Sequence, residues 1–519
     1  MSTNTKIAKA YIILIAASIF GNILSMGKEM LSAKYFGITK AMDAYYVALT
    51  IPNFIYAIIT SIFVFFIPIF IKHKTHDKEE ANKIASIVVN YLFIFLVLSA
   101  IVIFVFANEM LRYGFRGLDT ETYILSVKIL RIICFTVIFS GLISMLSSIL
   151  NAYEHFTWPA FSQTFITISV IILILFFTKK WGVFVFVWGL LIGLLIQFAF
   201  LAPISKKKGY KHYLSFNWRH PAIKEILQLS FIFYMLSILG SLNPFINRTM
   251  ASWLPSGSIA ALSYADKLVQ VPLMIFSGTI ATAIYPFLST QIAENKIEDM
   301  KDSLATGIKM TGFIFIPMAV IMIILARPTI KLLFQRGIFD AQATDLTSVI
   351  YICYTFQLFT NYAAVIINRI FLIYKDMMVL FKIVLLNILL TIILNFIFMK
   401  IINPPAAGIA LSASVTSLFI TIFLFKLLKK RINNIHGISI IKSLIKTTFF
   451  ALISGLMTFI AFQGLSILFP TPSFLNHFIQ LAGASIIGLT VFAVISYLMK
   501  FKEAEKIFYL IKNKFGTAF

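Results

Sequence analysis

The sequence contains few cysteines, few charged residues and no long polar segment. Two cysteines among 519 residues exclude a small secreted fold held together by disulfides. Charged residues make up 12% of the chain, against roughly 25% in soluble domains. Hydrophobic residues make up 60%, which excludes intrinsic disorder, because disordered chains combine low hydrophobicity with high charge. A polytopic membrane protein is the remaining class.

Long, nearly unbroken apolar runs indicate helices, since the strands of a membrane barrel would alternate apolar and polar residues. Val170–Phe177 and Ile383–Phe398 are examples. A spanning helix needs about 20 apolar residues, and windows of about 19 residues locate the candidates. We therefore predict an all-α polytopic fold with about fourteen spans. The expected spans are 8–34, 42–71, 85–108, 126–150, 158–178, 182–203, 224–249, 260–290, 305–325, 344–372, 378–399, 406–428, 443–466 and 475–499.

The chain repeats itself at an offset of about 220 residues, which corresponds to six spans. Because six is even, both halves enter the membrane from the same side, as in a parallel repeat. The sequence predicts a lobe at 1–205, a second at 206–440, and a terminal pair with a tail at 441–519. Such folds place a substrate cavity between halves. The matching pairs are Ile51-Pro52 with Val271-Pro272, Arg116-Gly117 with Arg336-Gly337, Cys134 with Cys353, Asn151–Glu154 with Leu372–Lys375, and Gly189 with Gly408.

The net charge of +24 is distributed unevenly over the expected loops. On the side that holds both termini we count 24 Lys and Arg, against 11 on the other. Cytoplasmic loops carry the excess of positive residues, so both termini are expected in the cytoplasm. The charge therefore reflects topology, and no nucleic-acid partner is expected.

Six ionisable residues inside the expected spans are the candidate substrate-binding residues, because placing a charge there is costly. Neighbouring helical residues point about 100° apart, so the adjacent opposite charges are expected to find partners elsewhere or to face water. Two competing interpretations stay open. Asp43 could cap a helix N-terminus, and Arg369 could extend its charged end to the membrane surface. The candidates are Lys28, Glu29, Asp43, Asp266, Lys267 and Arg369.

No catalytic constellation, nucleotide-binding loop or metal-ligand cluster stands out, so we expect neither an enzyme nor a cofactor or bound metal. A cationic cavity suits an anionic cargo. An inside-negative membrane potential would assist export of an anion by about 2.3 kcal/mol per charge per 100 mV. Coupling to this potential or to a monovalent ion stays open.

Three stretches of the chain form a recognisable joint pattern: Gly27–Asn53, Ser263–Pro272 and Leu333–Asp340. Together they resemble the MurJ/MviN lipid II flippases, a family within the multidrug/oligosaccharidyl-lipid/polysaccharide exporters. The resemblance covers nearly the whole chain and the plan of six, six and two spans. It implies movement of undecaprenyl-diphosphate-linked peptidoglycan precursor from the inner to the outer leaflet of a bacterial plasma membrane. It further implies a cationic cavity and alternating access.

The same resemblance assigns roles to individual residues. Two cavity arginines of the family fall on Lys28 and Lys267, and an aspartate of its second helix falls on Asp43. Two further arginines of the family fall on Asn22 and Tyr56. The cavity is therefore expected to be less cationic here.

Three alternatives remain open. The cargo could be another polyprenyl-diphosphate glycan, from a capsule, teichoic acid or exopolysaccharide. The protein could instead be a cation-coupled drug exporter, which should show acidic cavity residues. It could also be a scaffold without transport activity, which should carry large soluble domains. Expected partners are the lipid-linked glycan, membrane lipids and cell-wall synthesis proteins.

Overall fold

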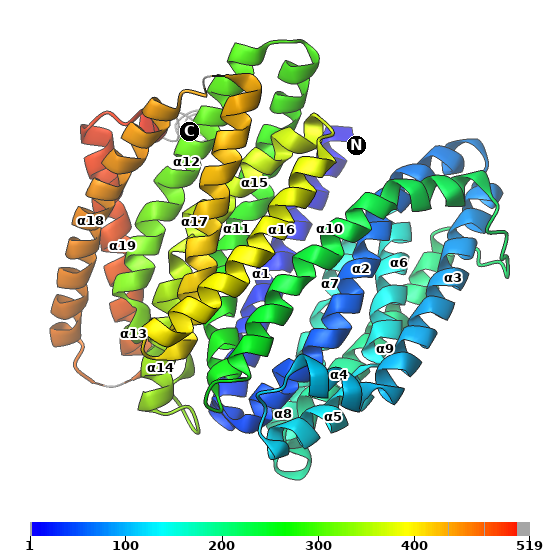
Figure 1. Ribbon diagram of the computed structural model, residues 1–519, viewed down its shortest axis with the longest axis horizontal. Helices are drawn as coiled ribbons and strands as arrows, with labels where there is room; N and C mark the ends of the chain where they lie inside the picture. The colour runs from blue at the N-terminus through cyan, green and yellow to red at the C-terminus, as the bar shows by residue number, and fades with distance from the viewer. Residues whose placement is uncertain (1–2, 434, 472, 506–519) are drawn as a thin grey trace. The chain divides into compact units, whose positions relative to one another are not determined.

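The computed structural model describes residues 3–433, 435–471 and 473–505, with side chains except those of 3–17, 232 and 273–283. Within these ranges, the regular secondary structure is entirely α-helical (Figure 1). The helices before the middle of the chain are α1 (Thr3–Phe36), α2 (Lys40–His76), α3 (Lys78–Val105), α4 (Ala107–Gly114), α5 (Thr120–Ile133), α6 (Thr136–Ala152), α7 (Thr157–Ser162), α8 (Thr164–Trp181) and α9 (Phe184–Lys207). They are followed by α10 (Pro221–Ala251), α11 (Ser258–Ala293), α12 (Ile297–Ile324), α13 (Ala326–Phe334), α14 (Ala341–Thr355), α15 (Gln357–Ile373), α16 (Met377–Ile401), α17 (Pro405–Ile432), α18 (Gly437–Leu468) and α19 (Phe474–Leu498).

The all-α membrane fold predicted from the sequence is confirmed. Among the described residues, ten helical segments are long and apolar enough to cross a membrane, or twelve if each of two bent pairs is one span. One such pair, α5 and α6, is bent by 40° within the expected span 126–150. The first and eighth expected spans coincide with α1 and α11, which are continuous helices. The count of fourteen stays a prediction.

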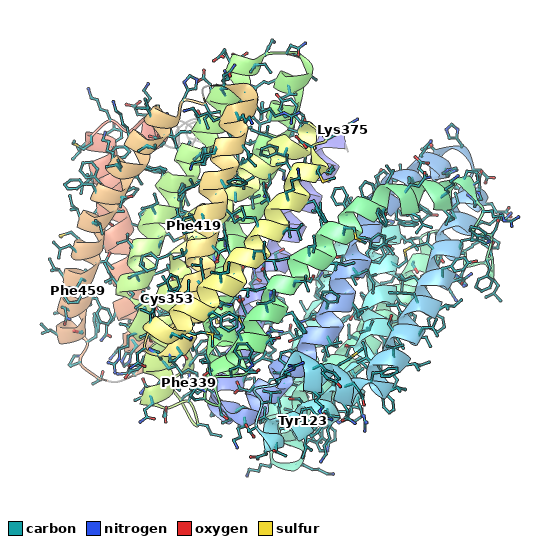
Figure 2. All side chains as sticks on the ribbon, viewed as in Figure 1. Tyr123, Phe339, Cys353, Lys375, Phe419 and Phe459 are labelled. Atoms are coloured by element: carbon teal, nitrogen blue, oxygen red, sulfur yellow. The ribbon has the colours of Figure 1, made fainter. Side chains whose placement is uncertain are left out.

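Large apolar side chains stand exposed along these helices. Phe419 on α17 and Phe459 on α18, labelled in Figure 2, are 53% and 48% exposed. In water this would be costly, but hydrocarbon tails solvate such faces. The exposed apolar surface therefore fits a lipid-facing bundle.

The backbone repeats at the offset found in the sequence. The short helices α4 and α13 begin at corresponding positions of the two halves, Ala107 and Ala326. The residues before them have almost identical dihedral angles: φ −93° and ψ 17° at Phe106, φ −92° and ψ 14° at Leu325. Two left-handed turns, at Glu154 (φ 64°) and Lys375 (φ 57°), also correspond to each other in the repeat. The internal repeat therefore extends to local conformation.

The chain divides into two compact units. Unit 1 holds residues up to Ala260 together with Arg336–Asp340, and unit 2 holds Ala261–Gln335 with the chain from Ala341 onward. In unit 1, α2 packs against α10, α3, α5 and α6, whereas in unit 2 the pair α18–α19 packs against α12. The boundaries at 205 and 440 that the sequence predicts describe the repeat, and they stay a prediction.

Candidate functional site

Lys28 and Glu29, adjacent on α1, form an ion pair with each other. Lys28 Nζ lies 2.9 Å from Glu29 Oε1, and the two side chains are 25% and 7% exposed. The expectation that these neighbours would not pair is wrong. The long, flexible lysine side chain spans the angle between adjacent helical positions, and a poorly solvated carboxylate favours the nearest cation.

Asp43 caps a helix, but not the one on which it lies. It sits in the first turn of α2 and is 4% exposed. Its carboxylate accepts hydrogen bonds from the backbone N–H groups of Gly257, at 2.5 Å, and Ala260, at 2.7 Å. These groups belong to the start of α11, where unpaired N–H groups and the helix dipole favour a negative charge. The capping role left open by the sequence therefore acts on a helix that is distant from Asp43 along the chain.

Gly257, one of the partners of Asp43, occupies a position that only glycine tolerates. Its φ is +90°, and a Cβ atom there would lie 2.3 Å from the carbonyl oxygen of Ile38. This close approach brings the loop before α11 onto the loop before α2 within unit 1.

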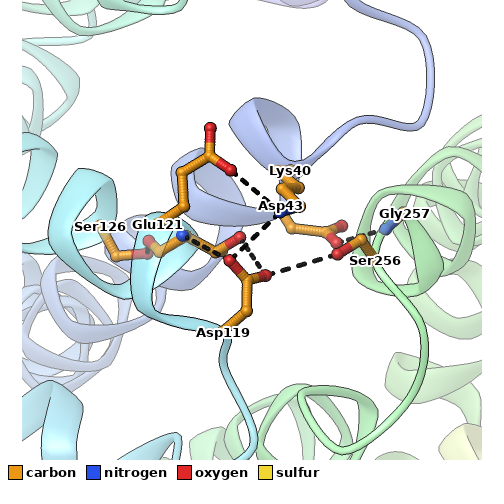
Figure 3. Close-up of polar contacts among 8 residues, drawn as sticks. Lys40, Asp43, Asp119, Glu121, Ser126, Ser256 and Gly257 are labelled. Carbon is orange, nitrogen blue, oxygen red and sulfur yellow. Dashed lines mark hydrogen bonds and ion pairs between the residues drawn. The ribbon is translucent and has the colours of Figure 1, made fainter.

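A second polar cluster lies beside Asp43 (Figure 3). Lys40 Nζ lies 2.9 Å from Glu121 Oε2 and 3.5 Å from Asp119 Oδ1. Ser256 Oγ donates a hydrogen bond of 3.4 Å to the Asp119 carboxylate. Asp119 also caps α5 by accepting from the Thr122 N–H at 3.1 Å, and this bond, followed by the Thr122 hydroxyl and Lys40, holds its pKa below the usual value. The cluster ties the starts of α2 and α5 to the loop before α11.

Arg248 is a half-buried cation that is not among the six candidate residues predicted from the sequence. It lies in the last turn of α10. Its Nη1 donates to Thr50 Oγ1 at 2.9 Å and to the carbonyl of Tyr46 at 3.3 Å, both on α2. Its position at the end of the seventh expected span was the available signal, since arginines within spans are rare and functional.

The remaining candidates belong to unit 2. Asp266 and Lys267 on α11 are both half-buried, and Asp266 Oδ1 accepts a hydrogen bond of 3.3 Å from Gln270 one turn onward. Arg369 on α15 lies over the ring of Tyr285, with 5.5 Å between the guanidinium carbon and the ring centroid. An aromatic face stabilises a cation at this distance. That Asp266, Lys267 and Arg369 share one cavity with Lys28 stays a prediction.

The two positions where arginine was expected from the family resemblance carry neutral, exposed side chains. Asn22 is exposed on α1, and Tyr56 on α2 is 41% exposed. The Tyr56 hydroxyl accepts a hydrogen bond of 3.3 Å from Ser144. Among the described residues, no group of three or more His, Cys, Asp and Glu could hold a metal ion.

Long apolar helices in a repeated arrangement, with lysine and arginine inside them, are typical of polytopic membrane transporters. A solved structure entitled "Inward-facing conformation of a multidrug resistance MATE family transporter of the MOP superfamily" shares this fold, with a TM-score of 0.67 at 15% identity over 82% of this chain and 99% of the other. The family model described as "Lipid II flippase MurJ" matches residues 32–498. The chain belongs to the MurJ family.

Individual relatives agree with this assignment. The chain is 28% identical to "Probable lipid II flippase MurJ" of Buchnera aphidicola over 77% of its length and 79% of that protein. It is 24% identical to "Lipid II flippase MurJ" of Burkholderia cenocepacia over 92% and 89%. The structure entitled "Lipid II flippase MurJ, inward closed conformation" aligns with a TM-score of 0.77 and 25% identity, covering 94% of this chain and all of that one.

Proposed function

We propose that this protein is a flippase that moves lipid II from the inner to the outer leaflet of the membrane by alternating access. The observation that carries the proposal is the match to the MurJ family over residues 32–498, nearly the whole chain. The protein is a multi-pass protein of the bacterial inner membrane, and the family is one of transporters. Movement of a lipid between leaflets makes and breaks no covalent bond, so we propose that the protein is not an enzyme.

The cations inside the helices are proposed to bind the diphosphate of the substrate. Lysine is a point charge that suits phosphate oxygens. Lys28, Lys267 and Arg369 are partly accessible, at 25% side-chain exposure for Lys28. Because Lys28 already faces Glu29, the diphosphate would compete with that carboxylate. This competition gives a way for the substrate to be released after it crosses.

Both termini are proposed to lie in the cytoplasm, on the basis of the excess of Lys and Arg in the loops on that side. In this orientation the membrane potential favours outward movement of the diphosphate. We propose that this potential, or a monovalent ion, drives the cycle without a cofactor. Cell-wall synthesis proteins are the proposed partners.

Genetic complementation tests the function. The native lipid II flippase is depleted in a bacterium, and this chain is expressed with Lys28→Ala and Lys267→Ala at matched levels. We expect rescue by the unchanged chain and at least a tenfold lower plating efficiency with either variant. Lys179→Ala, at an exposed position at the end of α8, is the matched control and should rescue.

A double variant separates substrate binding by Lys28 from simple charge balance. Lys28→Ala with Glu29→Gln removes both charges of the pair. If Lys28 only neutralises Glu29, the double variant will rescue growth and contradict the proposed role. If Lys28 binds diphosphate, the double variant will fail like the single one. Failure of the unchanged chain, when correctly inserted, would favour another lipid-linked glycan as cargo.

A further inference from the structure

The segment 208–220 between α9 and α10, here called the strap, lies extended along α3. Three polar residues of α3, spaced four apart on one helical face, hold it: Asn82, Ser86 and Asn90. Asn82 Nδ2 donates to the Gly209 carbonyl at 3.1 Å, and the Tyr213 N–H donates to Ser86 Oγ at 3.0 Å.

Asn90 extends this attachment to the middle of the strap. Its Nδ2 donates to the carbonyl of Tyr213 at 3.1 Å and to that of Ser215 at 2.9 Å. All three α3 residues are at most 7% exposed. The strap backbone is therefore fixed, and so are the directions of its side chains.

The fixed backbone divides the strap into an inner and an outer face. Tyr210 is 5% exposed and packs inward. Leu214, Phe216 and Trp218 are 85%, 50% and 63% exposed. Three large apolar side chains on so short a stretch of extended chain would be unfavourable in water, so their exposure needs an apolar environment.

The position of the strap along α3 identifies that environment. The Tyr91 hydroxyl donates to the Phe216 carbonyl at 2.7 Å, and the two rings meet edge to face with centroids 5.9 Å apart. Immediately beyond Tyr91, α3 exposes a run of large apolar side chains, whereas the exposed side chains of the helix before it are Lys78, Glu79 and Lys83. The exposed apolar residues are Phe93, Ile94, Phe95 and Leu98. The outer face of the strap therefore lies at the level where α3 enters hydrocarbon, where aromatic residues concentrate.

The charges around the strap are predominantly positive. The exposed cations on it and just before it are Lys206, Lys207, Lys208, Lys211 and Arg219. The acidic residues at the start of α3 face other groups: Glu79 pairs with Lys83 at 2.9 Å, and Glu80 lies 3.3 Å from His73 and 3.6 Å from His220. Asp77 caps α3. Arg219 lies over the ring of Trp218, with 5.4 Å between its guanidinium carbon and the ring centroid. The exposed strap lysines are therefore the groups that face an external anion.

We propose that the strap is a binding surface for anionic phospholipid headgroups, with the cations on the phosphates and Leu214, Phe216 and Trp218 in the acyl boundary. Juxtamembrane clusters of Lys and Arg are attracted to an anionic membrane surface. Basic residues combined with Trp, Phe and Leu are typical of interfacial segments. With the proposed orientation, the strap faces the anionic cytoplasmic leaflet. The bound lipid is bulk phospholipid, and the strap residues are different from those proposed to bind the transported diphosphate.

Depth-dependent fluorescence quenching tests this proposal. The full chain with Trp158, Trp181, Trp188 and Trp253 changed to Phe keeps Trp218 as its single tryptophan. It is reconstituted in phosphatidylcholine vesicles containing either brominated phosphatidylglycerol or, at the same mole fraction, brominated phosphatidylcholine. We expect at least twofold stronger quenching by the brominated anionic lipid. Lys207→Gln with Lys211→Gln should abolish that difference, and Lys179→Gln with Lys180→Gln, a matched exposed pair, should preserve it.

Other outcomes would overturn the proposal. Equal quenching by both lipids would make the strap an apolar contact without headgroup preference. No quenching would place Trp218 in water or under another protein. An equal loss in the control pair would indicate a general charge effect. If the single-tryptophan chain fails to fold, a thermal assay replaces the quenching assay. The two lysine double variants are then made in the chain with all its tryptophans, and their thermal stabilisation by phosphatidylglycerol is compared. Equal stabilisation of the two double variants would overturn the proposal. The readout does not depend on transport or on orientation in the vesicle.

Discussion

At the scale of single residues, charges in apolar helices are informative because each needs compensation. The sequence located these charges, since a costly residue within a span is visible by its type alone. Their partners were not visible. Lys28 pairs with its neighbour, and Asp43 pairs with backbone N–H groups of Gly257 and Ala260. Backbone donors leave no mark in the sequence, because every residue except proline carries one.

Asp43 should contribute strongly to stability. Asp43→Ala removes the acceptor of two charge-assisted hydrogen bonds, so the N–H groups at the start of α11 lose their partner. This loss should lower the free energy of unfolding by on the order of 3 kcal/mol. We expect a clear fall in the thermal unfolding midpoint of the purified chain, and a smaller fall for Asp43→Asn, which keeps one oxygen. The exposed Asp299→Asn is the control and should leave the midpoint unchanged. An unchanged midpoint in Asp43→Ala would contradict the capping role.

At the scale of elements, glycines and caps decide how loops close on helix ends. The segment Arg336–Asp340 belongs to unit 1, although its chain neighbours on both sides belong to unit 2. Its Ile338 N–H donates to the Lys34 carbonyl at 3.0 Å, at the end of α1. Gly337 makes this approach possible, because its φ is +62° and a Cβ would lie 2.1 Å from the same carbonyl oxygen. The repeated Arg-Gly pair therefore has a steric explanation at this position.

Gly337→Ala should destabilise the chain more than Gly182→Ala. Both glycines have positive φ, which costs another residue about 1–3 kcal/mol. Gly182 has open space around it, whereas Gly337 adds a collision with backbone that cannot move aside. Thermal unfolding of the two variants in the same detergent measures the difference. Equal losses would show that the segment 336–340 does not rest on α1.

The cap of α5 should make stability depend on pH. The pKa of Asp119 lies below its usual 3.8 in the folded chain, chiefly because of the hydrogen bond from the Thr122 N–H. The folded state therefore binds fewer protons, so this contribution is complete above the unfolded pKa and is lost as the pH falls through the folded one. We expect Asp119→Asn to lower the unfolding midpoint at neutral pH. The difference in unfolding midpoint between this variant and the unchanged chain should disappear as the pH falls below 3.8. A difference that persists in acid would contradict this account.

At the scale of the whole molecule, the chain consists of a repeat and two compact units that do not coincide with it. The offset found in the sequence recurs in the backbone at α4 and α13 and at two left-handed turns. Unit 1 nevertheless extends to Ala260, because α10 packs against α2. Chain symmetry and packing are separate properties, since a helix packs where its apolar faces fit, whichever half encodes it.

Topology can be tested on the whole molecule with two cysteines. Cys134→Ala with Cys353→Ala removes both native thiols. Lys179→Cys and Lys430→Cys then place one thiol at each of two exposed helix ends, expected outside and inside respectively. A membrane-impermeant maleimide applied to spheroplasts should label only Lys179→Cys, and permeabilisation should expose Lys430→Cys. The reverse pattern would contradict cytoplasmic termini.

The sequence by itself determined the class of the protein, its all-helical membrane fold, its internal repeat and which residues carry charge into the apolar helices. These properties follow from the free energy of transferring each side chain into hydrocarbon, which is local and nearly additive along the chain. Only the tertiary structure decided that Asp43 caps α11, that Arg248 reaches Thr50 on α2, and that the strap lies along Asn82, Ser86 and Asn90. These contacts join segments that are distant in the chain, through short-range hydrogen bonds with strict geometry. Such partners are selected by the packing of whole helices, which no local pattern of residues encodes.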